Sequence, residues 1–551
     1  MSGGLRIVRR PFGSEGSLGA RYAAGDEAVI SLLAPTTPHG AASDRAELDA
    51  PEAAEHRCGR RIDPEVFHTS SPEAARKLKT VLNGDGAFVT TGHQPCLLLG
   101  PLYVLYKALT AIEVAVRLES RLGIPVLPLF WVASDDHDWD EVGSTCLVDT
   151  ANALRRFRLE PPPGRAGRSV GETVLDEPIR DLMLDVWQAV PQSEFITDYI
   201  KLFEDAYRPG RSIGEAFGVA LEGTLQGREL VWLDAAEARV KAALAPMYRR
   251  ALLEAAEAEA AVVAGTERVR SAGFEAQLAV PAGASNVFYD DGTARLRVYV
   301  SGRSARIGRA GPEKPLADLI SELEERPEAF GPSAALRPVA ESCLLPVAAT
   351  VLGPSEIGYW AQLPDLFAWA GLDVPRVVPR TGWSVMEAKV TKVLNSLAAR
   401  PEDLSDGGVA LAGRTVRAGR PDSVAEALAE LQMTQEAAFD SVAQALAEEI
   451  PGIRATAEKA RAGARKALRQ LERAVDGSVR ERQSVLRGQI EKAALHLFPG
   501  GVAQERVMSP IYYLARYGTE FLEQLDREVR DEVEEYVAGP GRGLGSADPA
   551  T

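Results

Sequence analysis

Residues 124–142, IPVLPLFWVASDDHDWDEV, join a run of apolar residues directly to a cluster of acidic ones. A short, nearly continuous apolar run is typical of a parallel strand that is covered on both faces. In open sheets of such strands, ligands bind just beyond the carboxyl ends of the strands. Ser134–Glu141 holds four aspartates, one glutamate and one histidine. The stretch therefore predicts both an α/β fold and a polar site at the end of a strand.

The residues before this stretch complete a strand–helix–strand unit. Residues 87–90 predict a strand, residues 91–100 a loop that contains glycine, and Pro101 stands where a helix would begin. Apolar residues then recur at helical spacing to about Leu122. A second unit of this kind is expected from a strand at 343–352, a helix to about residue 370 and a strand at 374–378, and residues 229–234 predict a further strand.

The expected fold is α/β, a doubly wound parallel sheet with two connecting insertions, followed by an α-helical antiparallel coiled coil. Pro451 and Gly452 separate the two helices of the coiled coil, and an apolar and alanine-rich seam lines both. The expected parts are residues 1–142 (N-terminal part of the core), 143–225 (first insertion), 226–264 (core strand and helix), 265–340 (second insertion, β-rich, with a hairpin at 285–300), 341–385 (C-terminal part of the core), 386–500 (coiled-coil domain), 501–538 (C-terminal helical segment) and 539–551 (disordered tail).

Composition narrows the class of protein. The formal net charge of −16 disfavours a large nucleic-acid footprint, which needs clustered Lys and Arg. No apolar run approaches the roughly 20 residues that span a bilayer, and the first residues lack the apolar core of a signal peptide. We therefore expect a cytoplasmic protein without a membrane or nucleic-acid partner. The four cysteines form no CxxC pair, so free thiols are expected rather than a disulfide framework or a zinc knuckle.

Four loops follow predicted strands and should face one crevice, because the carboxyl ends of parallel strands meet at one edge of a sheet. They are residues 91–100, 134–141, 353–356 and 379–384. In the first loop, His93 could bind a phosphate or act as a general acid, or it could simply cap local backbone. Gly353 and Ser355 allow a similar anion site, or only a helix start.

Asp135–Asp138 has three interpretations. The carboxylates and His137 could hold a divalent cation, they could form an acid/base pair suited to an amine substrate, or they could be a solvated acidic loop. Arg337 and Arg380 are candidates for binding a carboxylate. Tyr359 and Trp360 could wall the pocket, and core packing would explain these aromatic residues equally well. Lys107 is expected to be a surface lysine.

At these residues the chain resembles a known family, the cysteine-adding enzymes of bacillithiol biosynthesis (cysteine ligases). The resemblance is carried by TTGHQPCLLLGPLYVLYKALTAI (90–112), FWVASDDHDWDEV (130–142), ALRPVAESCLLPV (335–347), LGPSEIGYWAQL (352–363), VPRVVPR (374–380) and QERVMSPIYYLARYG (504–518). It implies a Rossmann-like core, a coiled coil through which the chain forms a homodimer, and a reaction that joins cysteine to glucosamine-malate. An activated acyl intermediate implies ATP, and a divalent cation is compatible with the carboxylates, although no metal ligand is assigned.

The chain departs from the family pattern at His93, where glutamine is common, and at Cys96, Asp135 and Ser355. Within the resemblance, we expect His93, Asp136, His137 and Asp138 to be catalytic. The residues expected to bind substrate or nucleotide are Thr91, Gly92, Gln94, Gly100, Ser134, Asp135, Gly353, Ser355, Glu356, Tyr359, Trp360, Arg337 and Arg380. The alternatives are a nucleotidyltransferase or ligase acting on another small amine or thiol, and a catalytically inactive coiled-coil scaffold.

Overall fold

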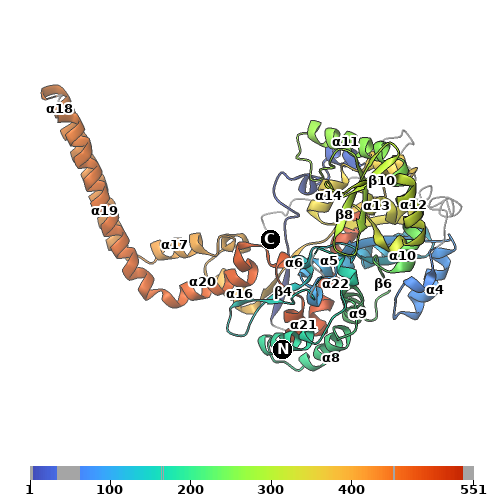
Figure 1. Cartoon of the computed structure of the whole chain (residues 1–551). Coiled ribbons are helices and arrows are strands. Elements are labelled where there is room, and N and C mark those ends of the chain that lie inside the picture. The colour runs from blue at the N-terminus through green and yellow to red at the C-terminus, as the bar shows by residue number, and fades with distance from the viewer. Residues whose placement is uncertain (1–3, 34–61, 163, 165–166, 451–452, 538–551) are drawn as a thin grey trace. The chain divides into compact units, whose positions relative to one another are not determined.

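The structure is a computed structural model that describes residues 4–33, 62–162, 164, 167–450 and 453–537 (Figure 1). The break at Pro451 and Gly452, Cys58, and the tail predicted at 539–551 lie outside the described residues. The chain divides into two compact units. One comprises Ile7–Ser384 and Glu505–Thr551, and the other comprises Met1–Arg6 and Val385–Gln504.

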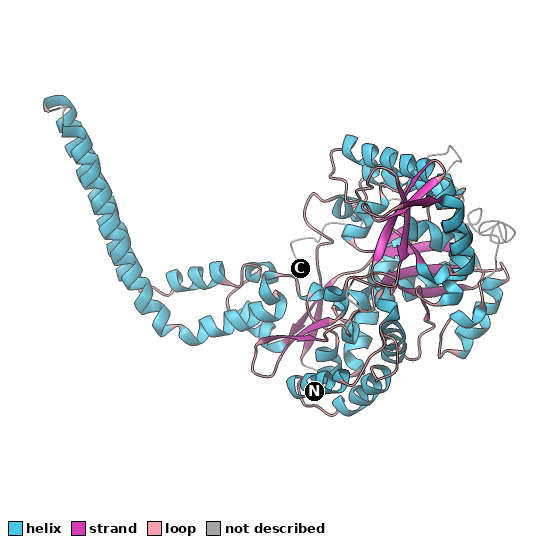
Figure 2. Ribbon diagram, viewed as in Figure 1, coloured by secondary structure: helices cyan, strands magenta, loops and turns pink. Residues whose placement is uncertain are grey.

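The first unit is built on a five-stranded parallel sheet in the order β13-β12-β2-β3-β6. This sheet confirms the predicted α/β fold. Its strands are β2 (Ala87–His93), β3 (Val126–Val132), β6 (Val231–Asp234), β12 (Val347–Leu352) and β13 (Arg376–Pro379). Every residue of β3 is buried, as the continuous apolar run predicts, and the strands of this unit lie among helices (Figure 2).

Helices connect and cover these strands. α5 (Leu102–Leu122) joins β2 to β3, and α14 (Pro354–Trp360) and α15 (Pro364–Ala370) join β12 to β13. Further α-helices of the unit outside the insertions include α1 (Leu18–Ala23), α2 (Glu27–Ile30), α4 (Pro72–Leu82), α10 (Ala238–Leu253), α21 (Ile511–Tyr517) and α22 (Thr519–Val537). Phe88 of β2 and Leu127, Leu129 and Trp131 of β3 belong to the main hydrophobic core.

The strand predicted at 343–352 is wrong in its first part. α13 (Leu336–Leu344) is a helix that includes Cys343, and β12 begins only at Val347. Pro346 follows the end of the helix, where its missing N–H costs nothing. The expectation of free thiols holds for Cys96 and Cys146 but not for Cys343, which is disulfide-bonded.

The insertions carry their own elements. Residues 139–224 hold α6 (Trp139–Val142), β4 (Ser144–Val148), β5 (Leu154–Arg158), α7 (Pro178–Ala189), α8 (Ile196–Ala206) and α9 (Ile213–Thr224). Residues 255–332 hold α11 (Ala255–Ser271), β7 (Ala284–Asp290), β8 (Arg295–Ser301), β9 (Ser304–Ile307), β10 (Glu313–Pro315), α12 (Leu316–Glu325) and β11 (Phe330–Pro332). The last five strands form an antiparallel sheet in the order β10-β9-β8-β7-β11, and β7 and β8 confirm the predicted hairpin.

The second unit contains the coiled coil, in which α18 (Asp422–Glu449) packs against α19 (Arg454–Arg482). Its other helices are α16 (Ala388–Ser396), α17 (Val409–Ala418) and α20 (Ser484–Leu497). The predicted seam is partly wrong. Leu428 is buried, but Leu431, Val442 and Leu471 are exposed, because two helices cover only one narrow stripe of each other. The two segments at the boundary between the units are β1 (Leu5–Arg9) and β14 (Trp383–Glu387).

Candidate active site

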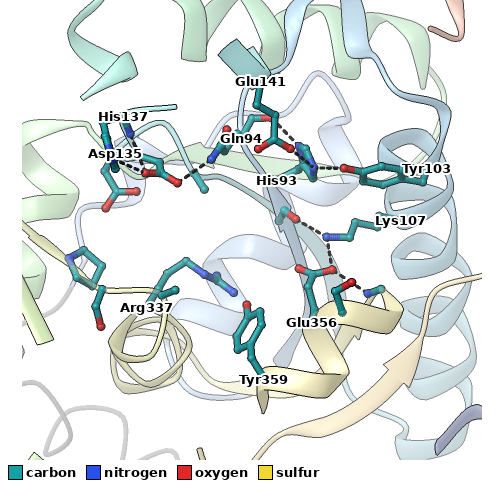
Figure 3. Close-up of a pocket in the computed structure, with 18 of the residues that line it drawn as sticks. His93, Gln94, Tyr103, Lys107, Asp135, His137, Glu141, Arg337, Glu356 and Tyr359 are labelled. Atoms are coloured by element: carbon teal, nitrogen blue, oxygen red, sulfur yellow. Dashed lines mark hydrogen bonds and ion pairs between the residues drawn. The ribbon is translucent and has the colours of Figure 1, made fainter. Parts of the chain in front are cut away.

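A cavity of about 520 Å³ opens beyond the carboxyl ends of the parallel strands (Figure 3). Residues from all four predicted loops line it, so the structure brings together what the strand ends predicted. The predicted residues in its wall are Gly92, His93, Gln94, Asp135, Asp136, His137, Arg337, Gly353, Ser355, Glu356, Tyr359 and Arg380. Figure 3 shows His93 and His137 on one side of the cavity, with Arg337, Tyr359 and Glu356 facing them.

Five predicted residues do not line this cavity. The hydroxyl of Thr91 donates to Val351 O (3.0 Å), that of Ser134 donates to the carboxylate of Asp234, and Asp138 caps α6 by accepting from Glu141 N (3.1 Å). Trp360 packs in the core. A Cβ at Gly100 would lie 2.7 Å from the Thr145 hydroxyl, so this glycine serves close packing. Each of these side chains is thus engaged in the scaffold and not directed at a ligand.

His93 is a neutral, doubly hydrogen-bonded side chain. Its Nδ1 lies 3.0 Å from Gln94 O; a carbonyl can only accept, so Nδ1 carries the proton. Nε2 therefore accepts from the Tyr103 hydroxyl, 2.8 Å away. Burial, together with the charge of Lys107, lowers the pKa of His93 to about 4. The general-acid role predicted for His93 would thus require one of these hydrogen bonds to break.

His93 also belongs to a group of three side chains that could hold a metal ion. Among the described residues, His93, Cys96 and Glu141 place one ligand atom each within 4.8 Å of one another. Burial, followed by the charge of Glu141, raises the pKa of the Cys96 thiol, and burial also raises the pKa of Glu141. A cation would reverse both shifts, but it would have to compete with the hydrogen bonds of the imidazole. The donor types fit a divalent cation, whereas the hydrogen bonds of His93 do not favour one.

Asp136 and His137 form a pair at the mouth of the cavity. His137 Nδ1 lies 3.0 Å from Asp136 Oδ1, and Gln94 Nε2 donates to Asp136 Oδ2 (2.6 Å). Burial acts to raise the pKa of Asp136, but the hydrogen bond from His137 and the charge of Arg295 outweigh it and lower the pKa to about 2. The carboxylate is therefore ionised and orients the imidazole, whose side chain is half exposed. Of the three interpretations of this loop, the geometry favours the acid/base pair.

Lys107 was expected at the surface, and that expectation is wrong. Its side chain is 2% exposed, and Nζ donates to Gly92 O (2.8 Å) and pairs with Glu356 Oε2 (2.6 Å). Glu356 also accepts from Gly353 N (2.7 Å). Burial lowers the pKa of Lys107, against the opposing effect of Glu356. The sequence held a signal, because α5 is apolar around most of its circumference, so a lysine within it has to be buried.

The predicted carboxylate-binding arginines already have internal partners. Arg337 pairs with Glu341 (2.6 Å), and Arg380, 3% exposed, makes two bonds to Glu505 (2.7 and 3.1 Å). Asp135 likewise pairs with the buried Lys241 (3.1 Å). The sequence reasoning also missed other residues of the cavity wall, among them Tyr103, Phe288, Arg295, Arg297 and Arg506. Alternation along β8, which places Arg295 and Arg297 on one face, was the available signal.

Comparison with known proteins shows that both parts of the chain match models of one family. Residues 64–381 match a model described as "Bacillithiol biosynthesis BshC, N-terminal Rossmann-like domain", and residues 384–535 match one described as "Bacillithiol biosynthesis BshC, C-terminal coiled-coil domain". The chain belongs to the BshC family. A protein of Salinibacter ruber named "Putative cysteine ligase BshC" is 30% identical over 461 residues, 83% of each chain. One of the same name from Symbiobacterium thermophilum is 31% identical over 459 residues, 80% of this chain and 81% of that one.

Membership in the BshC family makes the chain a ligase with a role in bacillithiol biosynthesis. The match to the Rossmann-like domain spans every predicted site residue, from Thr91 to Arg380. The family's two-part organisation confirms the predicted core and coiled coil. No helix in the described part of the chain is both long and apolar enough to cross a bilayer.

Proposed function

We propose that this BshC-family ligase joins the carboxyl group of cysteine to the amine of glucosamine-malate through an activated acyl intermediate. The printed name of the relatives, cysteine ligase, supports cysteine as one substrate. The observation that carries the proposal is the Asp136–His137 pair beside the arginine-rich wall of the same cavity. Attack by an amine requires a positioned group that takes its proton, and a histidine whose imidazole is held by an ionised carboxylate can do so.

The proposed mechanism assigns a proton transfer to His137. Asp136 fixes Nδ1 of His137 and stabilises the imidazolium that forms when Nε2 takes a proton from the acceptor amine. The freed amine then attacks the activated carboxyl carbon of cysteine, an amide bond forms and the activating group leaves. Amide formation from a free carboxylate is unfavourable in water, so the proposal includes ATP as the activating substrate. A divalent cation, if one takes part, would find its donors in His93, Cys96 and Glu141.

The test is turnover of purified protein with ATP, cysteine and glucosamine-malate, followed by mass spectrometry of the thiol product. His137→Ala and Asp136→Asn are each expected to lower turnover about 10²-fold or more, the range of general-base catalysis. Glu160→Gln, on the exposed surface, is the matched control. Undiminished turnover of both site variants would refute the assignment, and product formed only with another amine or thiol acceptor would refute the substrate.

We also propose a cytoplasmic homodimer that associates through the coiled coil. Leu431, Val442 and Leu471 are 46%, 50% and 46% exposed outside the seam between α18 and α19, and this apolar surface supports association. ATP and reduced cysteine are available in the cytoplasm, which supports that location. Light scattering should give twice the mass of one chain. Leu431→Glu with Val442→Glu should give the mass of one chain, and an unchanged mass would refute dimerisation through this surface.

A further inference from the structure

Two guanidinium groups lie against one aromatic ring in the cavity wall. Arg295 and Arg297 are two residues apart on β8, so their side chains lie on the same face of the strand. The guanidinium carbon of Arg295 is 4.1 Å and that of Arg297 is 4.6 Å from the centre of the Phe288 ring. Phe288 is the cross-strand neighbour of Arg297 on β7. The hairpin therefore holds two like charges beside each other at the edge of the cavity.

The charge of Arg297 has no acidic counterpart among the described residues. Arg337, Arg380 and Lys107 each pair with a glutamate, whereas the guanidinium of Arg297 has no ion pair with a described residue and lies over the Phe288 ring. Arg295 donates to Pro332 O (2.8 Å) and lies 3.7 Å from Asp136. Burial and the charge of Arg295 lower the pKa of Arg297. An unpaired, half-buried guanidinium beside a second one is stabilised when an anion bridges the two.

A helix N-terminus faces the same part of the cavity. Ser333 and Ala334, which precede α13, line the cavity with the two arginines. The backbone N–H groups of Ala334 and Ala335 make no hydrogen bond to another described residue. Free N–H groups at the start of a helix attract anions through their partial positive charge. Two independent features, the arginine pair and the helix start, thus favour negative charge at one place.

We propose that Arg295, Arg297 and the N-terminus of α13 form a subsite for the carboxylates of the acceptor, that is, for its malate part. This inference rests on the proposed function. Arg295 adjoins Asp136, so a small ligand that carries both an amine and carboxylates can contact His137 with the first and the arginines with the second. The subsite belongs to the β7–β8 hairpin of the insertion and not to the glycine-bearing loops at the strand ends, where open α/β sheets bind nucleotides.

The experiment measures binding of L-malate to the full-length protein by calorimetry, without turnover. We expect Arg297→Met to weaken malate binding about tenfold or more, the size of a lost charge-assisted hydrogen bond, and Arg297→Lys to weaken it less. Arg303→Met is the matched control, because Arg303 is an exposed arginine in the turn between β8 and β9 that does not line the cavity. Thermal unfolding of the Arg297 and Arg303 variants should agree, which separates ligand binding from folding.

Turnover provides a second measurement. Arg297→Met should raise KM for glucosamine-malate about tenfold or more and leave KM for cysteine and ATP unchanged. With glucosamine, which lacks malate, the variant and the unmodified protein should have equal KM values. Malate binding that is absent, or equal in all variants, would overturn the inference, as would weakened binding of ATP or inorganic phosphate with malate binding unchanged. Arginine-dependent malate binding without any ligation would support the subsite and refute the proposed reaction alone.

Discussion

The neutral state of His93 leads to a prediction that pH can test. In the folded protein the pKa of this imidazole is about 4, whereas the ordinary value is 6.5. Between these values the unfolded chain binds a proton that the folded chain does not, so the free energy of unfolding falls as pH is lowered. pH 5.0 lies one and a half units below the pKa of the unfolded chain, so at this pH His93 lowers the free energy of unfolding by about 2 kcal/mol. The side chain is 10% exposed, so solvent screens little of this effect.

The assay compares the unmodified protein with His93→Gln at pH 7.5 and pH 5.0. All seven tryptophans of the chain lie between residues 131 and 383, within one unit. Urea unfolding followed by tryptophan fluorescence therefore reports on the unit that contains His93. Glutamine does not titrate, so His93→Gln should not show this loss of stability on acidification. Between pH 7.5 and pH 5.0 the free energy of unfolding of the variant should therefore rise by about 2 kcal/mol relative to that of the unmodified protein. Other titrating groups contribute equally to both and cancel.

A substitution of Tyr103 provides a control, because it should raise the pKa of His93. Its hydroxyl donates to the unprotonated Nε2 and so stabilises the neutral imidazole. Tyr103→Phe should raise the pKa of His93 toward 6.5, which NMR of ¹³C-labelled histidine can measure once His93→Gln has identified the signal. A stability difference that does not vary with pH, or a His93 signal that titrates near 6.5 in the unmodified protein, would refute the reasoning.

Three further predictions concern stability. Lys107→Met leaves Glu356 without its cation and should lower the free energy of unfolding by about 3 kcal/mol. In a double-mutant cycle, Lys107→Met together with Glu356→Gln should cost less than the sum of the two single changes. Strictly additive costs would contradict the pairing. Gly265→Ala places a Cβ 2.0 Å from the backbone oxygen of Gln362 and should lower stability by about 1–3 kcal/mol. Gly463→Ala, on a helix where a Cβ meets nothing within 4 Å, should raise stability by up to about 1 kcal/mol, and circular dichroism can follow both glycine variants.

Local apolar patterns were sufficient to predict the sheet. β3 formed where its apolar run placed it. β2 begins at the predicted residue but continues to His93, because Thr91–His93, predicted as the start of a loop, still pair with β3. The apolar run around Cys343 misled because a buried helix and a buried strand share such a run over a few residues. The seam of the coiled coil was predicted with the right period but partly on the wrong face, since period alone does not say which of two adjacent stripes meets the partner helix.

The site was predictable only where chemistry and position coincided along the chain. His93 is the last residue of β2, and Asp136 and His137 lie in the loop after β3, so the crevice rule located them. Arg297 comes from a hairpin about two hundred residues downstream in the sequence, and only the folded chain shows that it faces the same cavity. The partners that neutralise Arg337 and Arg380 were equally out of reach, because ion pairing depends on three-dimensional neighbours.

The ion pair of Lys107 with Glu356 connects two loops at the edge of the sheet. It ties the end of β2, through Gly92 O, to the start of α14, through the glutamate that also holds Gly353 N. The spacing of these two loops is thereby fixed, so the sheet edge has little freedom to adapt to ligands of different size. The β7–β8 hairpin, which we propose binds the acceptor, is not held by this ion pair, so replacing that hairpin alone is the most direct way to change which acceptor is used.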